Sequence, residues 1–138
     1  MPDTTTPNIN HARGVLSEVR DEMIVFTKPE TDYQIHLNVL MTPSTPVGKR
    51  IVGTIRAEAR RVDVCGTGGA YVEPVYGRPR RVQGEIIAVD ASGGTITVHA
   101  GFGPFVCKLS DARQRADHFN VGDFVTFAVL PGATFTPA

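Results

Sequence analysis

The chain has 138 residues, of which 41% are hydrophobic and 20% are charged, so it has enough apolar side chains for a packed core and too few charges for a disordered chain. Its 14 glycines and 10 prolines indicate many turns and short elements, which favours a β-sandwich or barrel over a helical bundle. The 14 basic and 14 acidic side chains cancel, so net charge neither favours nor excludes a polyanionic partner.

The N-terminal segment, residues 1–11, is polar and is expected to be a flexible tail. It contains no apolar run of the kind found in secretory signals, and no run elsewhere approaches the length of a membrane span. We therefore expect a cytoplasmic protein with no membrane contact and with Cys65 and Cys107 as reduced thiols. A disulfide that links these two cysteines is the less favoured alternative.

Residues 12–65 read as the first of two β-rich halves. Five strand-like runs are expected here, at residues 14–19, 23–26, 33–37, 47–56 and 61–65. In the third run, apolar side chains alternate with polar ones from Tyr33 to Leu37, which is typical of a half-buried strand. Pro43 and Pro46 exclude a regular helix between the third and fourth runs.

Residues 66–81 are rich in glycine and proline and are expected to form a linker or a long loop. The glycine-rich stretch at 65–69 is not followed by the Gly-Lys-Ser/Thr sequence of a phosphate-binding loop. Pro74 also disfavours a helix directly after the glycine-rich stretch. We interpret this stretch as a flexible turn.

Residues 82–138 read as the second half, and its runs match those of the first at an offset of about 70 residues. The matching runs lie at residues 84–89, 95–98, 105–109, 121–129 and 133–135. Gly14 and Gly84 open the first run of each half. Residues 110–118 form the one good helix candidate, with Ser110 as N-cap and Asp111 in the first turn.

The order strand-strand-strand-helix-strand-strand is that of an OB-fold barrel. We therefore predict an all-β fold of two OB-like five-stranded barrels, at residues 12–65 and 82–138, that are related by internal duplication. One short helix is expected in the second half. The two barrels are either separate or fused into one larger β-structure.

The second half resembles cold-shock-type OB domains. Residues 84–90, 105–110, 121–127 and 130–133 carry this resemblance. It implies nucleic-acid binding by aromatic side chains on the second and third strands. The second strand of this half has no aromatic residue, which leaves Phe105 on the third strand and Phe102 in the loop before it.

Residues 47–57 are similar to the closing strands of molybdate-binding Mop-like (TOBE) domains. That similarity implies a small oxyanion as ligand. Glu58 stands where the family usually has serine, and a carboxylate there would repel an oxyanion. Oxyanion binding is therefore a minor alternative.

Basic side chains concentrate in the middle of the chain. Residues 49–81 carry eight basic and three acidic side chains, a net charge of +5, whereas the flanks carry −3 and −2. Arginines interleaved with tyrosines can bind phosphates and stack bases, so we predict single-stranded RNA or DNA as the ligand. The candidate residues are Arg56, Arg60, Arg61, Tyr71, Tyr76, Arg78, Arg80, Arg81, Phe102 and Phe105. The alternative is that these arginines pair with the acidic flanks, within the chain or across an oligomer interface.

No sequence motif indicates an enzyme. His11, His36, His99 and His118 are scattered, without the spacing of metal ligands, and no serine or cysteine lies in a nucleophile motif. We therefore expect a non-catalytic binding module without metal or cofactor. The rival expectation is a structural or interaction protein that forms a homo-oligomer or docks on another protein.

Overall fold

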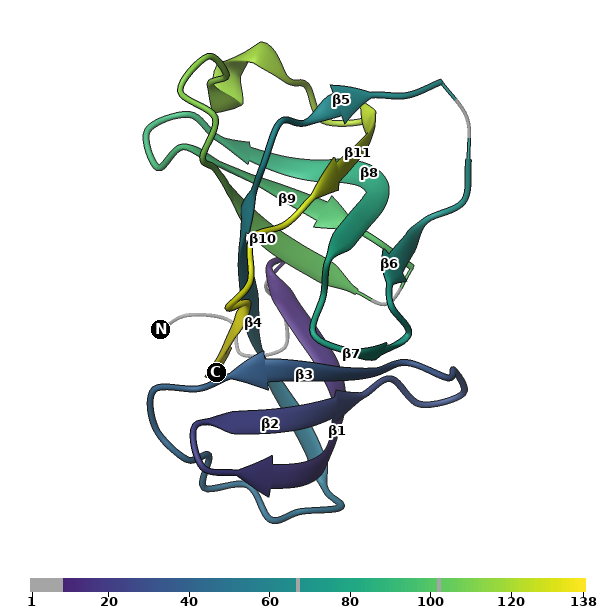
Figure 1. Cartoon of the computed structure of the whole chain (residues 1–138), viewed down its shortest axis with the longest axis vertical. Coiled ribbons are helices and arrows are strands. Elements are labelled where there is room, and N and C mark those ends of the chain that lie inside the picture. The colour runs from purple at the N-terminus through teal and green to yellow at the C-terminus, as the bar shows by residue number, and fades with distance from the viewer. Residues whose placement is uncertain (1–8, 67, 102) are drawn as a thin grey trace, which may run out of the picture.

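The computed structural model describes residues 9–66, 68–101 and 103–138 and is built almost entirely of β-strands (Figure 1). The strands are β1 His11–Arg20, β2 Met23–Thr27, β3 Gln34–Asn38, β4 Arg50–Ala59, β5 Asp63–Val64, β6 Tyr71–Glu73, β7 Tyr76–Gly77, β8 Arg81–Asp90, β9 Thr95–His99, β10 Pro104–Leu109, β11 Phe124–Ala128 and β12 Thr134–Pro137. One 3-10 helix, η1, spans Ala116–His118. The prediction of an all-β fold is confirmed.

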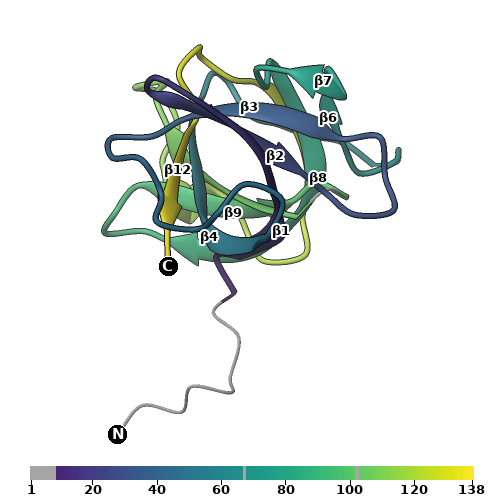
Figure 2. The ribbon, with the colours of Figure 1, turned by 90° about the horizontal axis from the view of Figure 1, so that it is seen from below.

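Five strands close into a barrel in the order β1–β2–β3–β12–β4, with β4 pairing back onto β1. Seen from below in Figure 2, these strands surround one interior. The closing strand β12 comes from the C-terminus. It lies parallel to β3 at Thr134↔Asn38 and antiparallel to β4 from Thr134↔Arg56 to Pro137↔Gly53. This order matches an OB-like barrel.

The strands β8, β9, β10 and β11 form a second group, in the upper part of Figure 1. It joins the barrel through β4, whose second half runs parallel to β10 from Ile55↔Phe105 to Ala59↔Leu109. On its other side, Val129, which directly follows β11, forms a single bridge with Ala59 of β4. All strands therefore belong to one hydrogen-bonded network with β4 at its centre.

One continuous hydrophobic core fills both groups. It forms because alternate residues of each strand point inward. In β4 the odd positions from Ile51 to Ala59 are buried, whereas Arg50, Arg56 and Glu58 are exposed on the outer face. The largest fully buried side chains include Phe26, Phe105, Phe127 and Phe135.

The two halves repeat one local arrangement of the backbone. A β-bulge interrupts β1 between Leu16 and Glu18 and β8 between Ile86 and Ala88. The N–H of Leu16 donates to the carbonyl of Lys49 at 3.0 Å, and the N–H of Ile86 donates to that of Asp123 at 2.8 Å. Gly48 and Gly122 bond back to Leu16 and Ile86, at 2.7 and 2.8 Å, and both glycines have positive φ.

The prediction of a helix at residues 110–118 is largely wrong, because only η1 forms there. The hydroxyl of Ser110 bonds to the carbonyl of Ala59 instead of capping a helix. The side-chain amide of Gln114 accepts from the N–H of Val62 at 2.8 Å and donates to the carbonyl of Val62 at 2.7 Å. These bonds to the end of β4 and to the segment after it replace the helical hydrogen bonds.

The segment expected as a linker, residues 66–81, contains two short strands and the first residue of β8. The strand β6 pairs antiparallel with β8, and β7 pairs parallel with β3. The strand β12, expected in the second barrel, completes the first one. The domain ranges 12–65 and 82–138 stay a prediction.

The two cysteines are free thiols, as expected. Cys107 is fully buried in β10, and burial raises the pKa of its thiol far above the ordinary value. No helix within residues 9–66, 68–101 and 103–138 is long and apolar enough to cross a membrane.

Candidate nucleic-acid interface

Of the two phenylalanines expected to stack on bases, Phe105 is the one that the structure describes, and its ring is not accessible to a base. Phe105 is fully buried in the core, with 0% exposure, so its prediction as a binding residue is wrong. Its side chain shares the core with that of Cys107, two positions further along β10, because residues two apart on a strand point to the same face. Phe102 lies outside the described residues.

Tyr71 and Arg81 belong to the sheet formed by β6, β8 and β11. The half-buried Tyr71 hydroxyl bonds to Oε1 of Gln83 at 3.1 Å. The guanidinium of Arg81 donates to Oγ1 of Thr126 at 2.9 Å. Arg80 and Arg81 line a small hollow together with Glu73 and Pro74. Tyr71 thus lies on β6, whereas Tyr76, the other tyrosine of the basic segment, lies on β7.

Arg60 and Arg61 follow the end of β4. Both side chains are exposed, and Nε of Arg61 lies 3.1 Å from a carboxylate oxygen of Asp63. Arg61 also borders a hollow with Asp111 and Arg113, where each arginine is paired with its own aspartate, Arg61 with Asp63 and Arg113 with Asp111. This place offers little net attraction for a polyanion.

Tyr76 and Arg78 come together with residues from outside the basic segment. We call Glu18, Arg20, His36, Tyr76 and Arg78 the Tyr76 cluster. The ring centroids of His36 and Tyr76 lie 5.0 Å apart in an edge-to-face arrangement of 72°. The guanidinium of Arg20 donates to the carboxylate of Glu18 at 2.7 and 2.9 Å. Pairing of β7 with β3 creates this cluster, because Tyr76 is held beside Gln34.

Arg78 is anchored at the edge of the same surface. Its Nη1 donates to Oδ1 of Asn38 at 2.8 Å, and its Nη2 lies 3.7 Å from the sulfur of Met23. The Tyr76 side chain is 59% exposed. An exposed aromatic ring thus shares the outer face of β1, β2, β3 and β7 with the cations Arg20 and Arg78, which both lie near His36.

His36 lies beneath Tyr76, and its Nε2 is buried with no hydrogen-bond partner among the described residues. The pKa of His36 is lowered mainly by burial, and the positive charges of Arg20 and Arg78 lower it further. Because the ordinary value is 6.5, His36 is neutral at pH 7. The positive charge of this surface therefore comes from its arginines.

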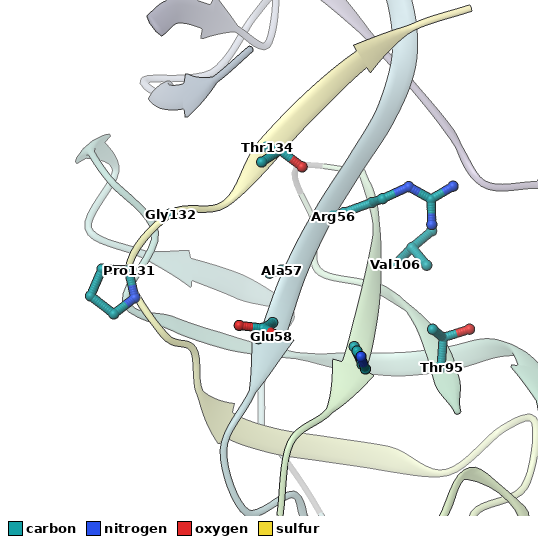
Figure 3. A pocket seen from close by; sticks show the side chains of 9 residues that line it. Arg56, Ala57, Glu58, Thr95, Val106, Pro131, Gly132 and Thr134 are labelled. Atoms are coloured by element: carbon teal, nitrogen blue, oxygen red, sulfur yellow. The ribbon is translucent and has the colours of Figure 1, made fainter. Parts of the chain in front are cut away.

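Arg56 lies on a different surface, in a groove on the outer face of β4 with a volume of about 310 Å³. The groove also contains Lys108 of β10, Glu58 of β4 and Thr134 of β12. Figure 3 shows the guanidinium of Arg56 extended toward Val106, while the Glu58 carboxylate turns toward the side of Pro131. The arginine is thus presented to solvent apart from the acidic group.

The alternative expectation, in which the basic segment pairs with the acidic flanks of the same chain, is not what the described residues show. Of the eight basic side chains at 49–81, Arg61 alone forms an ion pair there, and its partner Asp63 belongs to the same segment. The other ion pairs also join residues two positions apart in sequence. Most of these cations remain available to an external anion.

A further groove, near the C-terminus, is apolar. It has a volume of about 480 Å³ and is lined by residues 40–44 and 134–137. Leu40 and Met41 are 98% and 81% exposed beside it. In contrast to the Tyr76 cluster, none of these lining residues is charged.

Sequence reasoning found Tyr76 and Arg78 but missed Arg20 and His36, which complete the cluster. Arg20 lies outside the basic segment, and His36 reads as an isolated histidine on a strand. Their proximity depends on the pairing of β7 with β3, which joins segments about 40 residues apart. No local signal in the sequence predicts that pairing.

In the part of the chain that the structure describes, no group of three His, Cys, Asp or Glu side chains is placed to hold a metal ion. Comparison of the chain with protein-family models, with curated proteins and with solved structures finds no match. The function must therefore be inferred from the surface itself.

Proposed function

We propose that this protein is a non-catalytic module that binds single-stranded nucleic acid, with Tyr76 as the stacking platform for a base. The observation that carries this proposal is the exposed Tyr76 ring, which shares one cluster with the guanidinium groups of Arg20 and Arg78 around His36. Arg20 is close enough to Tyr76 for the two side chains to interact. Arginines beside an aromatic ring are the combination that single-strand binding proteins use.

Each component has a separate physical role. A base stacked on Tyr76 contributes about 1–3 kcal/mol without selecting a particular sequence. Arg78, which is held by the neutral Asn38 and not by a carboxylate, attracts a neighbouring phosphate, and this contribution weakens as salt increases. His36 supports the Tyr76 ring from below through their edge-to-face contact.

We also propose that the chain consists of two OB-like units that arose by duplication and exchanged their last strands. The equivalent bulges and backbone hydrogen bonds of β1 and β8 support this proposal. The exchange is supported by the pairing of β12 with β3 and β4 of the first unit and by the pairing of β5 with β11 of the second unit. OB-like barrels commonly bind oligonucleotides, but fold alone does not establish function.

Fluorescence anisotropy with labelled oligo-dT and oligo-rU tests the proposal, at roughly 50 and 200 mM salt. We expect wild-type binding that weakens as salt rises. Tyr76→Ala should weaken it about fivefold or more, because stacking of one base is lost. Tyr76→Phe should bind like wild type, since its ring still stacks. Absence of binding at the lower salt concentration, or equal binding by Tyr76→Ala and wild type, would overturn the proposal.

A second candidate is a structural protein that assembles with further copies of itself. The exposure of Leu40 and Met41 beside an apolar groove favours this candidate. Light scattering at several protein concentrations distinguishes the two functions. Assembly that is lost in Leu40→Ser/Met41→Ser, without nucleic-acid binding by wild type, would favour the structural role.

A further inference from the structure

We propose that the outer face of β1 and β4 is a phosphate track that binds the backbone of the same nucleic-acid strand. The track starts at Arg13, Lys28 and Arg50 and continues along β4 to Arg56, with Lys108 beside it. This inference rests on the proposed function and adds the path of the backbone to it.

The track begins in a hollow of about 380 Å³ beside the first half of β1. Arg13, Lys28 and Arg50 line this hollow, together with the single acidic residue Glu30. The three cations come from three neighbouring segments. Val15 pairs with both Arg50 and Thr27, which brings β4 and the end of β2 to opposite sides of β1.

The arrangement of Arg13 and Arg50 is a diagonal one across two paired strands, because Arg13 pairs with Val52 and Val15 with Arg50. Diagonal neighbours in an antiparallel pair lie about 7–8 Å apart. Within residues 9–66, 68–101 and 103–138, neither arginine forms an ion pair. Adjacent like charges that form no ion pair do not stabilise the fold, and a bound polyanion would relieve their repulsion.

The outer face of β4 extends the positive charge beyond this hollow. Arg50 and Arg56 are both exposed and lie six positions apart, so strand alternation places them on one face. At about 3.3 Å per residue they are separated by roughly 20 Å. Arg56 lies in the groove that also contains Lys108, with Glu58 as the acidic residue. The two hollows thus lie along one strand, and each has more basic than acidic side chains.

The chemistry of the track favours phosphates over bases. Among the described residues that line the two hollows none is aromatic, so these residues offer a base no stacking platform. Point charges and guanidinium groups recognise phosphodiesters without reading sequence. β1 connects the track to the Tyr76 cluster, because it carries Arg13 near its start and Arg20 at its end.

The experiment compares two probes, labelled oligo-dT and inorganic polyphosphate of similar charge, by direct binding and competition. Arg13→Gln/Arg50→Gln is the test variant, and Arg113→Gln/Arg115→Gln is the control with the same change of net charge. Both variants replace exposed side chains, and matching thermal melts verify that both fold. Poly-glutamate is added as a competitor, because an acidic protein segment is a polyanion without phosphates.

We expect Arg13→Gln/Arg50→Gln to weaken both probes about tenfold at low salt, with the control close to wild type. Its slope of log K against log salt should decrease by about 1.4, since each phosphate contact contributes about 0.7 for single strands. Tyr76→Ala should weaken oligo-dT alone, because polyphosphate has no bases. Arg56→Gln should weaken both probes to a smaller degree than the double variant.

Equal binding by the test and control double variants would overturn the track. The track would also be overturned if poly-glutamate competed as strongly as polyphosphate, because the face would then suit an acidic peptide. Loss of oligo-dT binding in Tyr76→Ala, with no effect of Arg13→Gln/Arg50→Gln, would remove the track and keep the proposed function. The opposite pattern would remove stacking on Tyr76 and keep the track.

Discussion

The backbone of Gly14 in β1 lies directly against the ring of Phe26 in β2. A methyl group on Gly14 would lie 2.5 Å from Cε1 of Phe26 and 2.7 Å from the carbonyl oxygen of Thr27. Gly84 has the equivalent place in β8, where a methyl group would lie 2.0 Å from the carbonyl oxygen of His99. Glycine is therefore required at both positions because another strand passes too closely for a side chain.

Gly14→Ala and Gly84→Ala should each lower the free energy of unfolding by about 1–3 kcal/mol, as overpacked sites do. Gly84→Ala should cost more, because its nearest obstacle is a backbone oxygen at 2.0 Å, whereas the nearest atom at Gly14 belongs to the side chain of Phe26, at 2.5 Å. Urea denaturation measures the difference. Gly69→Ala is the matched control, since a methyl group on Gly69 would meet nothing within 4 Å. Equal stability of Gly84→Ala and Gly69→Ala would contradict the packing described for β8 and β9.

Phe135 couples the C-terminal strand to the first barrel. It is 2% exposed, and its ring centroid lies 5.3 Å from that of Phe26. Phe135→Ala should therefore reduce the free energy of unfolding by about 3–5 kcal/mol, because it leaves a cavity where β12 closes the barrel. Thr136→Ala, on the same strand and exposed, should change it by less than about 0.5 kcal/mol. Similar denaturation midpoints for these two variants would show that β12 does not close the barrel.

Gln114 acts as a substitute strand partner for Val62. Gln114→Ala should reduce the free energy of unfolding by about 1–3 kcal/mol, because the backbone N–H and carbonyl of Val62 lose their partner. Gln114→Glu keeps the shape but cannot donate to the carbonyl of Val62, so it should also destabilise the protein. Thermal and urea unfolding measure both effects. Wild-type stability of Gln114→Glu would show that the donated bond contributes nothing.

His36 should titrate with a pKa below 6.5, because burial and the charges of Arg20 and Arg78 disfavour its protonated form. A depressed histidine pKa means that the unfolded state binds the proton more readily. The folded state is thus favoured above pH 6.5 and loses this advantage as pH falls below that value. NMR titration of the His36 ring protons measures the pKa directly.

Arg78→Gln tests the cause of this shift. Removing one of the two positive charges that disfavour the protonated ring should raise the pKa of His36 toward its ordinary value. Arg113→Gln is the control, because Arg113 bonds to Asp111 in another part of the molecule. An unchanged pKa of His36 in Arg78→Gln would place Arg78 outside the Tyr76 cluster.

The strands of both halves were largely predictable because their signals are local. Alternation of apolar and polar residues locates β3, and β-prone runs locate β2, β9 and β11. The helix prediction failed because Ser110 and Gln114 bond to backbone far away in sequence. The short strands β6 and β7 were missed because the two or three residues of each acquire strand geometry from the neighbours β8 and β3.

The predicted binding residues show the same division. Their exposure could be anticipated for arginines, which remain solvated unless they are paired. Phe105 was misassigned because an aromatic residue on a strand has two possible faces, and the core determines which one it occupies. Tyr76 was identified for its place in a basic segment, whereas Arg20 and His36 join it only through strand pairing.

The sequence by itself determined where most strands lie and where positive charge concentrates, because these follow from side-chain periodicity and composition. Only the tertiary structure decided that β12 closes the first barrel, that β4 serves both groups of strands, and which arginines share a surface. The physical reason is that backbone hydrogen bonds between strands carry no sequence code of their own. The partner of each strand is selected by burial of the whole core.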